Sequence, residues 1–79
     1  MAMEIGTEWI QIAMENGGHV DVTRNYSELC GYKIMARMRW RNRKVIMGAD
    51  CNTVAEALNS LDTELANDAA NEMAECGSI

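Results

Sequence analysis

Arginine recurs at every second position near the middle of the sequence, a pattern that could bind anions. Arg37, Arg39 and Arg41 alternate with apolar residues, so in an extended strand they share one face at intervals of about 7 Å. This interval is close to the phosphate spacing of an extended single strand of nucleic acid. Because guanidinium groups donate paired hydrogen bonds to phosphates and carboxylates, this arginine ladder indicates an anionic partner. The rival interpretation is a solvated outer face, or a match to acids of the same chain.

Other side chains join the ladder if the flanking segments are also strands. The resulting surface mixes cations with exposed apolar and aromatic groups, as the centres of protein interfaces do. The candidate partner-binding residues are Lys33, Met35, Arg37, Arg39, Arg41, Arg43, Lys44, Ile46 and Trp9.

A second group of charged side chains lies toward the C-terminus. Acidic residues recur there at spacings of four, four and three, which places them on one stripe of a helix. The usual role of such a stripe is solubility. A functional role would be to imitate the phosphate backbone of a nucleic acid or to dock a basic partner. The acidic stripe comprises Glu64, Asp68, Glu72 and Glu75.

Charge is segregated along the chain. The 79 residues include 12 acids and 7 bases, which gives a formal net charge of −5. All the bases lie between Arg24 and Lys44, whereas 1–23 and 45–79 contain acids and no base. The overall acidity therefore does not exclude an anionic partner, because the basic segment can present a surface of its own.

Residues able to perform catalysis or bind a metal are sparse. Cys30, Cys51 and Cys76 are far apart, and the sequence has no Cys-x-x-Cys pair that could form a zinc knuckle with His19. It also has no glycine-rich phosphate loop and no nucleophile motif. We therefore expect a protein that is not an enzyme, with no metal and no cofactor, and the thiols favour a reducing compartment.

The length and the apolar content set further limits. A chain of 79 residues allows one domain, 1–79, with a thin core that association with a partner or a second copy would supplement. No apolar run approaches the roughly 18 residues of a membrane span, and the N-terminal residues do not resemble a signal peptide. We expect a cytoplasmic protein that does not contact membranes.

Two alternating apolar runs flank Asn16-Gly17-Gly18 and predict a β-hairpin with strands over 8–14 and 19–25. Asn-Gly between such runs is a strong hairpin signal, and a three-residue loop keeps the apolar side chains on one face. A competing interpretation is a helix over 4–16 that ends at the glycines, since the apolar residues, Trp9 among them, also fit helical spacing.

A second hairpin is predicted to follow. Apolar residues occupy the even positions of 31–41, which predicts a long amphipathic strand. Asn42-Arg43 can form a two-residue turn, since asparagine tolerates the backbone that the turn needs. A strand over 44–50 then returns, with Val45 and Met47 on the apolar face.

From Thr53 the period of the apolar residues becomes helical. Thr53 and Glu56 fit a capping box, and one face stays apolar to about residue 75. The sequence therefore predicts an α+β fold, in which a four-stranded antiparallel β-meander has one C-terminal helix, 53–75, packed on its apolar face.

Two resemblances follow from this arrangement. The segment 31–65 reads as strand, arginine-rich turn, strand and a helix that opens with Thr-x-x-Glu-Ala-Leu. In this it resembles the three-strand-plus-helix arm-binding domains of phage and transposon integrases, over less than half of the chain. The resemblance implies a sheet that enters the DNA major groove.

The second resemblance is to the small anti-CRISPR proteins of phages. The stretch Ile12-Ala13-Met14-Glu15-Asn16-Gly17, followed by an alternating strand, resembles the first hairpin of a four-strand member of that group. The size, the single-domain organisation and the segregated charge are also similar. The resemblance implies non-catalytic inhibition of a host nucleic-acid-processing complex, and it transfers no site residues.

The predicted function is that of a non-enzymatic binding protein, a phage-encoded inhibitor that binds a host nucleic-acid-processing complex of the CRISPR type through charged surfaces. The alternative is a sheet-type DNA- or RNA-binding module that uses the arginine-rich strand 33–44. A third hypothesis is a homodimer or larger oligomer, in which the basic strand of one copy meets the acidic helix of another.

Overall fold

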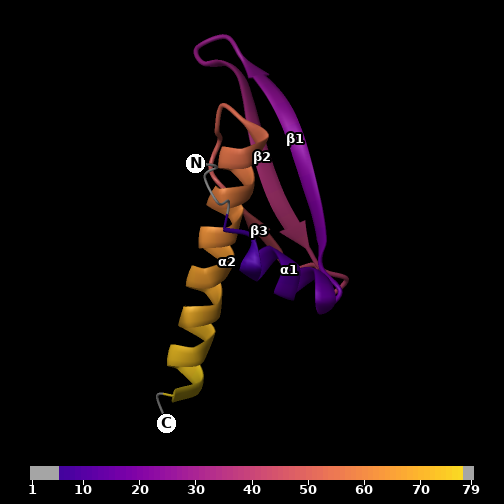
Figure 1. Ribbon diagram of the computed structural model, residues 1–79, viewed down its shortest axis with the longest axis vertical. Helices are drawn as coiled ribbons and strands as arrows, with labels where there is room; N and C mark the ends of the chain where they lie inside the picture. Colours follow the sequence, from indigo (N-terminus) through magenta and orange to yellow (C-terminus); the bar gives the residue numbers. More distant parts are fainter. Residues whose placement is uncertain (1–5, 78–79) are drawn as a thin grey trace.

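The computed structural model describes the backbone of residues 6–77 and the side chains of residues 6–72. It shows an α+β fold with a three-stranded antiparallel sheet, in the order β1-β2-β3, and two helices (Figure 1). The predicted fold class is confirmed, whereas the fourth strand and the single helix are not. In chain order the elements are α1 (Glu8–Glu15), β1 (His19–Ser27), β2 (Gly31–Arg39), β3 (Val45–Met47) and α2 (Val54–Gly77).

The segment 8–14, predicted as a strand, forms the helix α1, so that prediction is wrong. The competing interpretation is correct as to helix, but the helix is shorter than 4–16, and residues 4 and 5 lie outside the described residues. Ile10 and Ala13 are three residues apart and both buried, which is a helical spacing. The N–H of Gly18 donates to the carbonyl of Ala13 at 2.9 Å, as in a Schellman helix end, and Gly17 takes a φ of 89°. The glycine pair therefore closes a helix instead of a hairpin, because glycine adopts this left-handed conformation easily.

The start of α1 is held by a side chain from α2. Thr7, the N-cap residue, forms no capping hydrogen bond through its own side chain. Instead Asp62 Oδ1 accepts the N–H groups of Trp9 at 2.9 Å and Ile10 at 3.1 Å. A carboxylate at this position satisfies two N–H groups that have no partner within the helix, and it matches the positive end of the helix dipole. Asp62 therefore caps α1 and also fastens it to α2.

We expect Asp62→Ala to lower the free energy of unfolding by about 1 kcal/mol, the usual effect of removing an N-cap acceptor. Asp62→Asn is the matched control, because its amide oxygen can still accept both N–H groups, and it should retain most of the stability. Urea denaturation followed by tryptophan fluorescence measures both variants. Equal losses would show that Asp62 acts through its charge and not through capping.

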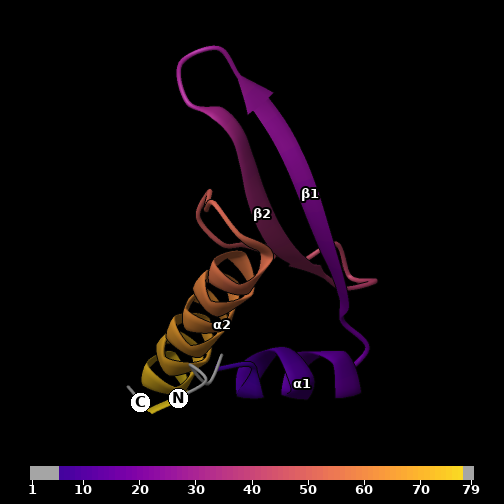
Figure 2. The same ribbon diagram turned by 45° about the horizontal axis from the view of Figure 1, so that its top comes forward.

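β1 and β2 form a long hairpin that extends past the N-terminal end of α2 (Figures 1 and 2). The strands pair residue by residue, from His19 opposite Arg39 to Ser27 opposite Gly31. The two central predicted strands are therefore confirmed, each with its end shifted by two residues. This hairpin forms the greater part of the sheet.

The loop between β2 and β3 is one residue longer than predicted. The N–H of Trp40 donates to the carbonyl of Lys44 at 3.0 Å, which leaves three residues in the loop instead of two. The N–H of Arg43 bonds to the carbonyl of Trp40, also at 3.0 Å, and Arg43 takes the left-handed φ of 69° that such a loop requires.

This extra residue reverses the faces of β3. Ile46 pairs with Met38 and lies on the core face, whereas Val45 pairs with Arg39 on the other face. The prediction that placed Val45 on the apolar face is therefore wrong, because a shift of one residue moves every side chain of a strand to the opposite face. The strand is also shorter than the predicted 44–50.

α2 packs on the face of the even-numbered strand residues, as predicted, and begins directly after Thr53. Thr53 Oγ1 accepts the N–H of Glu56 at 3.1 Å, which confirms the threonine half of the predicted capping box. The buried apolar side chains form one cluster between this helix, α1 and the sheet. The cluster comprises Ile10, Ala13, Ala36, Met38, Ala57, Leu61 and Leu65.

Candidate partner-binding surface

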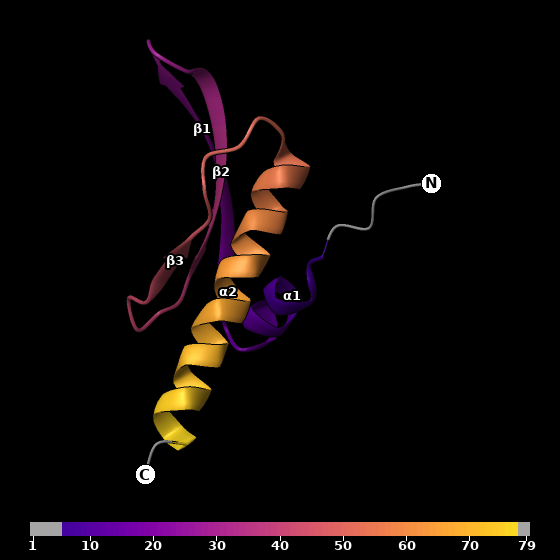
Figure 3. The ribbon, with the colours of Figure 1, turned by 90° about the vertical axis from the view of Figure 1, so that its left-hand side faces the viewer.

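One face of the sheet has no helix of the described chain packed on it. Figure 3 shows α1 and α2 on the same side of the sheet, which is the side of the buried even-numbered residues. The opposite side displays the odd-numbered residues, because side chains alternate along a strand. We call this surface the basic face; it comprises His19, Asp21, Thr23, Lys33, Met35, Arg37, Arg39, Val45 and Met47.

The structure places two arginines of the predicted ladder, Arg37 and Arg39, in cross-strand rows on the basic face, whereas Arg41 lies beyond the end of β2, in the loop. Arg37 lies between Asp21 and Met47, and Arg39 lies beside Val45. Met47 is 56% exposed and Val45 is 48% exposed. The cations therefore alternate with accessible apolar side chains, which is the composition of an interface centre.

Asp21 is a residue of this surface that sequence reasoning missed. Its Oδ2 lies 2.7 Å from Arg39 Nε and 3.6 Å from Arg37 Nε, so two guanidinium groups share one carboxylate. Part of the ladder is therefore matched within the same chain. The hairpin register is the signal that could have found this acid, because pairing Ser27 with Gly31 sets Asp21 opposite Arg37.

The basic face keeps a positive excess after this match. The basic face carries the three positive charges of Lys33, Arg37 and Arg39 and one negative charge, that of Asp21. Asp21 Oδ2 and Arg37 Nε are both covered from solvent, and neither forms a hydrogen bond of good geometry with the described residues. The other guanidinium N–H groups remain available as donors, since each arginine has five.

A hollow beside the β2–β3 loop is lined by Arg41 and Arg43, together with Arg39 of the basic face. It has a volume of about 440 Å³. Among the described residues its lining holds three guanidinium groups and no carboxylate, and neither Arg41 nor Arg43 forms an ion pair. The hollow can therefore accept a phosphate or a carboxylate. It is lined by His19, Arg39, Trp40, Arg41, Arg43 and Val45.

Five residues of the predicted binding set lie away from the basic face, and two of them, Arg41 and Arg43, lie in the β2–β3 loop and line the hollow. Ile46 packs against the core because of the longer loop, and Trp9 does so because its segment is a helix. Lys44 directly follows the loop and reaches across to α2. Lys33 stays on the basic face, where its Nζ donates to Asn52 Oδ1 at 2.6 Å.

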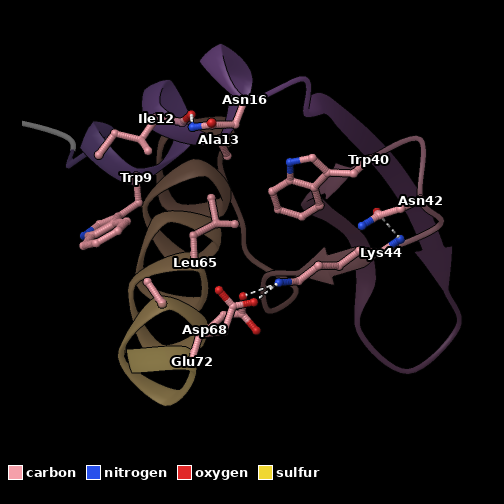
Figure 4. A pocket seen from close by; sticks show the side chains of 11 residues that line it. Trp9, Ile12, Ala13, Asn16, Trp40, Asn42, Lys44, Leu65, Asp68 and Glu72 are labelled. Carbon is pink, nitrogen blue, oxygen red and sulfur yellow. Dashed lines mark hydrogen bonds and ion pairs between the residues drawn. The ribbon is translucent and has the colours of Figure 1, made fainter. Parts of the chain in front are cut away.

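Lys44 joins the loop to the acidic stripe. Its Nζ lies 2.7 Å from Asp68 Oδ2, 2.6 Å from Glu72 Oε1 and 5.5 Å from the centre of the Trp40 ring. Figure 4 shows these ion pairs at the edge of a groove of about 300 Å³, with Leu65 of α2 in its wall. Lys44 therefore closes one end of this groove.

The acidic stripe is consequently less available than predicted. Asp68 and Glu72 are both engaged by Lys44. Glu64 is exposed, and the side chain of Glu75 lies outside the described residues. The stripe therefore has an internal partner, which favours the interpretation as a structural and solubilising feature.

The pKa of Lys44 provides a test of these ion pairs. The hydrogen bonds that Lys44 donates to Asp68 and Glu72 raise this pKa above the ordinary 10.5. Because the folded pKa exceeds the unfolded one, the stabilisation is complete below pH 10.5 and is lost as the pH rises through the folded pKa. We expect the Tm of the wild type to fall more steeply above that pH than the Tm of Lys44→Met. Thermal melts by circular dichroism measure both, and parallel curves would contradict the assignment.

No three His, Cys, Asp or Glu side chains of the described residues lie close enough together to hold a metal ion. Cys30 is exposed at the hairpin tip and Cys51 is half-buried, and both are free thiols. In the same part of the chain, neither helix combines the length and the apolar content that a membrane crossing requires.

No protein-family model, no curated protein and no solved structure matches this chain. The chemistry of the basic face and of the arginine-lined hollow is therefore the basis for the function.

Proposed function

We propose that this protein is a non-enzymatic binding protein that docks its basic face on a negatively charged surface of a host nucleic-acid-processing complex and blocks it. The uncovered basic face is the observation that carries the proposal. The class of partner follows from the resemblance to small phage inhibitors of CRISPR-type complexes, in size and in segregated charge.

The apolar side chains of the basic face support docking over simple solvation. A solvating face would not need Val45 and Met47, which are about half exposed beside the arginines. Covering them with a partner would remove apolar surface from water, while the arginines would select for acidic groups. Asp68 and Glu72 are already held by Lys44, so we assign the contact to the basic face and not to the acidic stripe.

Charge reversal tests the proposal. Arg39→Glu changes the basic face, and Arg24→Glu makes the same change of net charge on the opposite face of β1, so it is the control. Each variant would be expressed in bacterial strains that carry one CRISPR–Cas system directed against a test phage. The wild type and Arg24→Glu should restore plaque formation in a strain where Arg39→Glu does not.

Two results would contradict this function. One is a wild-type protein that restores plaques in no strain and captures none of the purified effector complexes. The other is an Arg39→Glu variant that folds, as judged by circular dichroism, and inhibits as well as the wild type.

The arginine-lined hollow favours a second candidate function, direct binding of nucleic acid. Arg41 and Arg43 have no ion pair among the described residues, and Trp40 adds an aromatic wall beside them. When arginines neutralise the phosphates of a nucleic acid, the cations condensed on it are released. The affinity of the protein for the nucleic acid should therefore fall steeply as the salt concentration rises. A single strand suits the small hollow better than a duplex, because its backbone can follow an isolated cluster of cations.

Fluorescence anisotropy with labelled single-stranded DNA, single-stranded RNA and duplex DNA tests this second candidate. Arg41→Ala should weaken binding and reduce the slope of log affinity against log salt by about one, whereas Arg24→Ala should change neither. An absence of binding to all three probes at low salt would eliminate direct binding and leave the inhibitor proposal intact.

A further inference from the structure

We propose that this protein forms a homodimer with two-fold symmetry, in which the β1 strands of two copies pair antiparallel and join the two sheets into one. The proposal concerns the outer edge of β1 and does not depend on the function proposed above. Two observations carry it: the backbone along this edge is open over its whole length, and exposed apolar side chains lie beside it.

β1 is an edge strand of nine residues, and the bonds of β2 show which of its backbone groups point outward. Ile34 exchanges two hydrogen bonds with Cys51, both 2.8 Å, and the carbonyl of Ala36 accepts the N–H of Gly48 at 3.0 Å. The even-numbered residues of β2 therefore direct their backbone N–H and C=O groups away from β1. The odd-numbered residues of β2 direct theirs toward β1 and form the hydrogen bonds of the hairpin. By the same alternation, the even-numbered residues of β1 point their N–H and C=O groups away from the sheet. These residues are Val20, Val22, Arg24 and Tyr26.

No bulge, proline or lysine closes this edge, because β1 pairs with β2 one-to-one along its whole length and its sequence contains neither residue. Those are among the devices that keep an edge strand from pairing. The strand does carry two charged side chains, but Asp21 pairs with Arg37 and Arg39, and Arg24 lies over the Tyr32 ring at 3.8 Å, so both have partners within the hairpin. Figures 1 and 2 show no helix along its outer side. The opposite edge is different, because β3 has only three residues and offers little to pair with.

Exposed apolar side chains lie beside the open edge. Val22 is 45% exposed and Tyr26 is 65% exposed, with the Tyr26 ring 5.0 Å from that of Tyr32. Tyr26 and Tyr32 pair near the tip of the hairpin, and the tip projects beyond α2 (Figure 2). Met14, which is also exposed, lies near the end of α1, where the chain turns into β1.

Antiparallel pairing of two β1 strands would bring these groups together. The two-fold axis of such a pair is perpendicular to the sheet, so the even-numbered side chains of both copies stay on one face. Val22 of one copy then lies opposite Val22 or Arg24 of the other. The projecting Tyr26 of each copy lies beside the start of the other β1, where α1 ends. The two basic faces meet on the opposite side and form one continuous surface.

A second copy is the occupant that these features fit. The edge requires a strand of comparable length with its own edge open, and every copy of the chain supplies one. A two-fold pairing also uses the same residues from both partners, as most homodimers do. Because a chain this short buries only about 60% of its unfolded surface, pairing would supply burial that the single copy lacks.

The molar mass in solution tests the proposal. Sedimentation equilibrium of the wild type should give the mass of two chains, falling toward one on dilution. Val22→Lys should raise the dissociation constant at least about tenfold, because each copy brings a charge to the axis. Val45→Lys is the matched control, a valine of similar exposure in β3, and it should leave the dimer unchanged.

Amide hydrogen exchange gives a second measurement that needs no variant. In a dimer the outward N–H groups of Val22 and Arg24 are bonded, so they should exchange at least about tenfold more slowly at high protein concentration than at low. A mass of one chain at every concentration would overturn the proposal, even if the edge binds a strand of another protein. A dimer in which the amides of Val22 and Arg24 exchange fast would also overturn the proposal. So would a dimer that Val45→Lys weakens as much as Val22→Lys does.

Discussion

Replacing Leu61 with alanine is expected to lower the free energy of unfolding by about 2–5 kcal/mol. The side chain of Leu61 is fully buried between α2 and the sheet, in the same cluster as Met38 and Ala36. A chain of 79 residues has a total stability of about 4–12 kcal/mol. This single truncation therefore removes a large share of it, and we expect a clearly lower urea midpoint than that of the wild type.

Leu29→Ala is the matched control for this prediction. Leu29 is 96% exposed at the tip of the β1–β2 hairpin, so the loss of the same atoms should leave the stability nearly unchanged. Urea titrations of the two variants at equal protein concentration measure the difference, because a dimer would make the stability depend on concentration. If Leu61→Ala loses no more than Leu29→Ala, the packing of α2 on the sheet is wrong.

The basic face could be predicted because it depends on a local property. Arg37 and Arg39 lie on the same face whenever their segment is a strand, and this does not depend on how the rest of the chain folds. The start of α2 was predictable for the same reason, since the cap from Thr53 to Glu56 spans three residues. Local periodicity and local capping are sufficient for both features.

The N-terminal helix was missed because two local signals competed. The alternation of apolar residues before Asn16 fits a strand, and Asn16-Gly17 fits a hairpin turn as well as a helix end. One contact that favours the helix comes from Asp62, which lies more than fifty residues away and caps α1. No pattern within the segment contains that contact, so the tertiary structure decides between helix and strand.

The faces of β3 depended on the length of one loop. A two-residue turn at Asn42-Arg43 and the observed three-residue loop differ by a single position, yet they place Ile46 on opposite faces. Arg43 can adopt the left-handed backbone, but arginine is not the residue that usually signals it. The pairing of Lys44 with the acidic stripe of α2 was missed for the same reason, because it follows from where this loop ends.

We expect Gly48→Ala to lower the free energy of unfolding by about 1–3 kcal/mol, the usual cost of overfilling a packed site. Gly48 follows β3 and is buried where the chain crosses α2. A Cβ atom there would lie 2.8 Å from the backbone nitrogen of Leu61 and 3.1 Å from its Cα. Both neighbours belong to the helix backbone, so no side-chain rotation can make room, and α2 has to move away from the sheet.

Two comparisons separate this clash from the other effects of replacing glycine. Gly31 has a φ of 72° and nothing within 4 Å of its added Cβ, so Gly31→Ala measures the cost of backbone conformation alone, about 1 kcal/mol. Gly48→Ala should exceed it in a urea titration. The double variant Gly48→Ala/Leu61→Ala should be at least as unstable as either single one, because truncating the Leu61 side chain does not remove the backbone atoms that clash. Rescue by the second substitution would mean that the side chain of Leu61, and not the approach of the two backbones, sets how close α2 lies to the sheet.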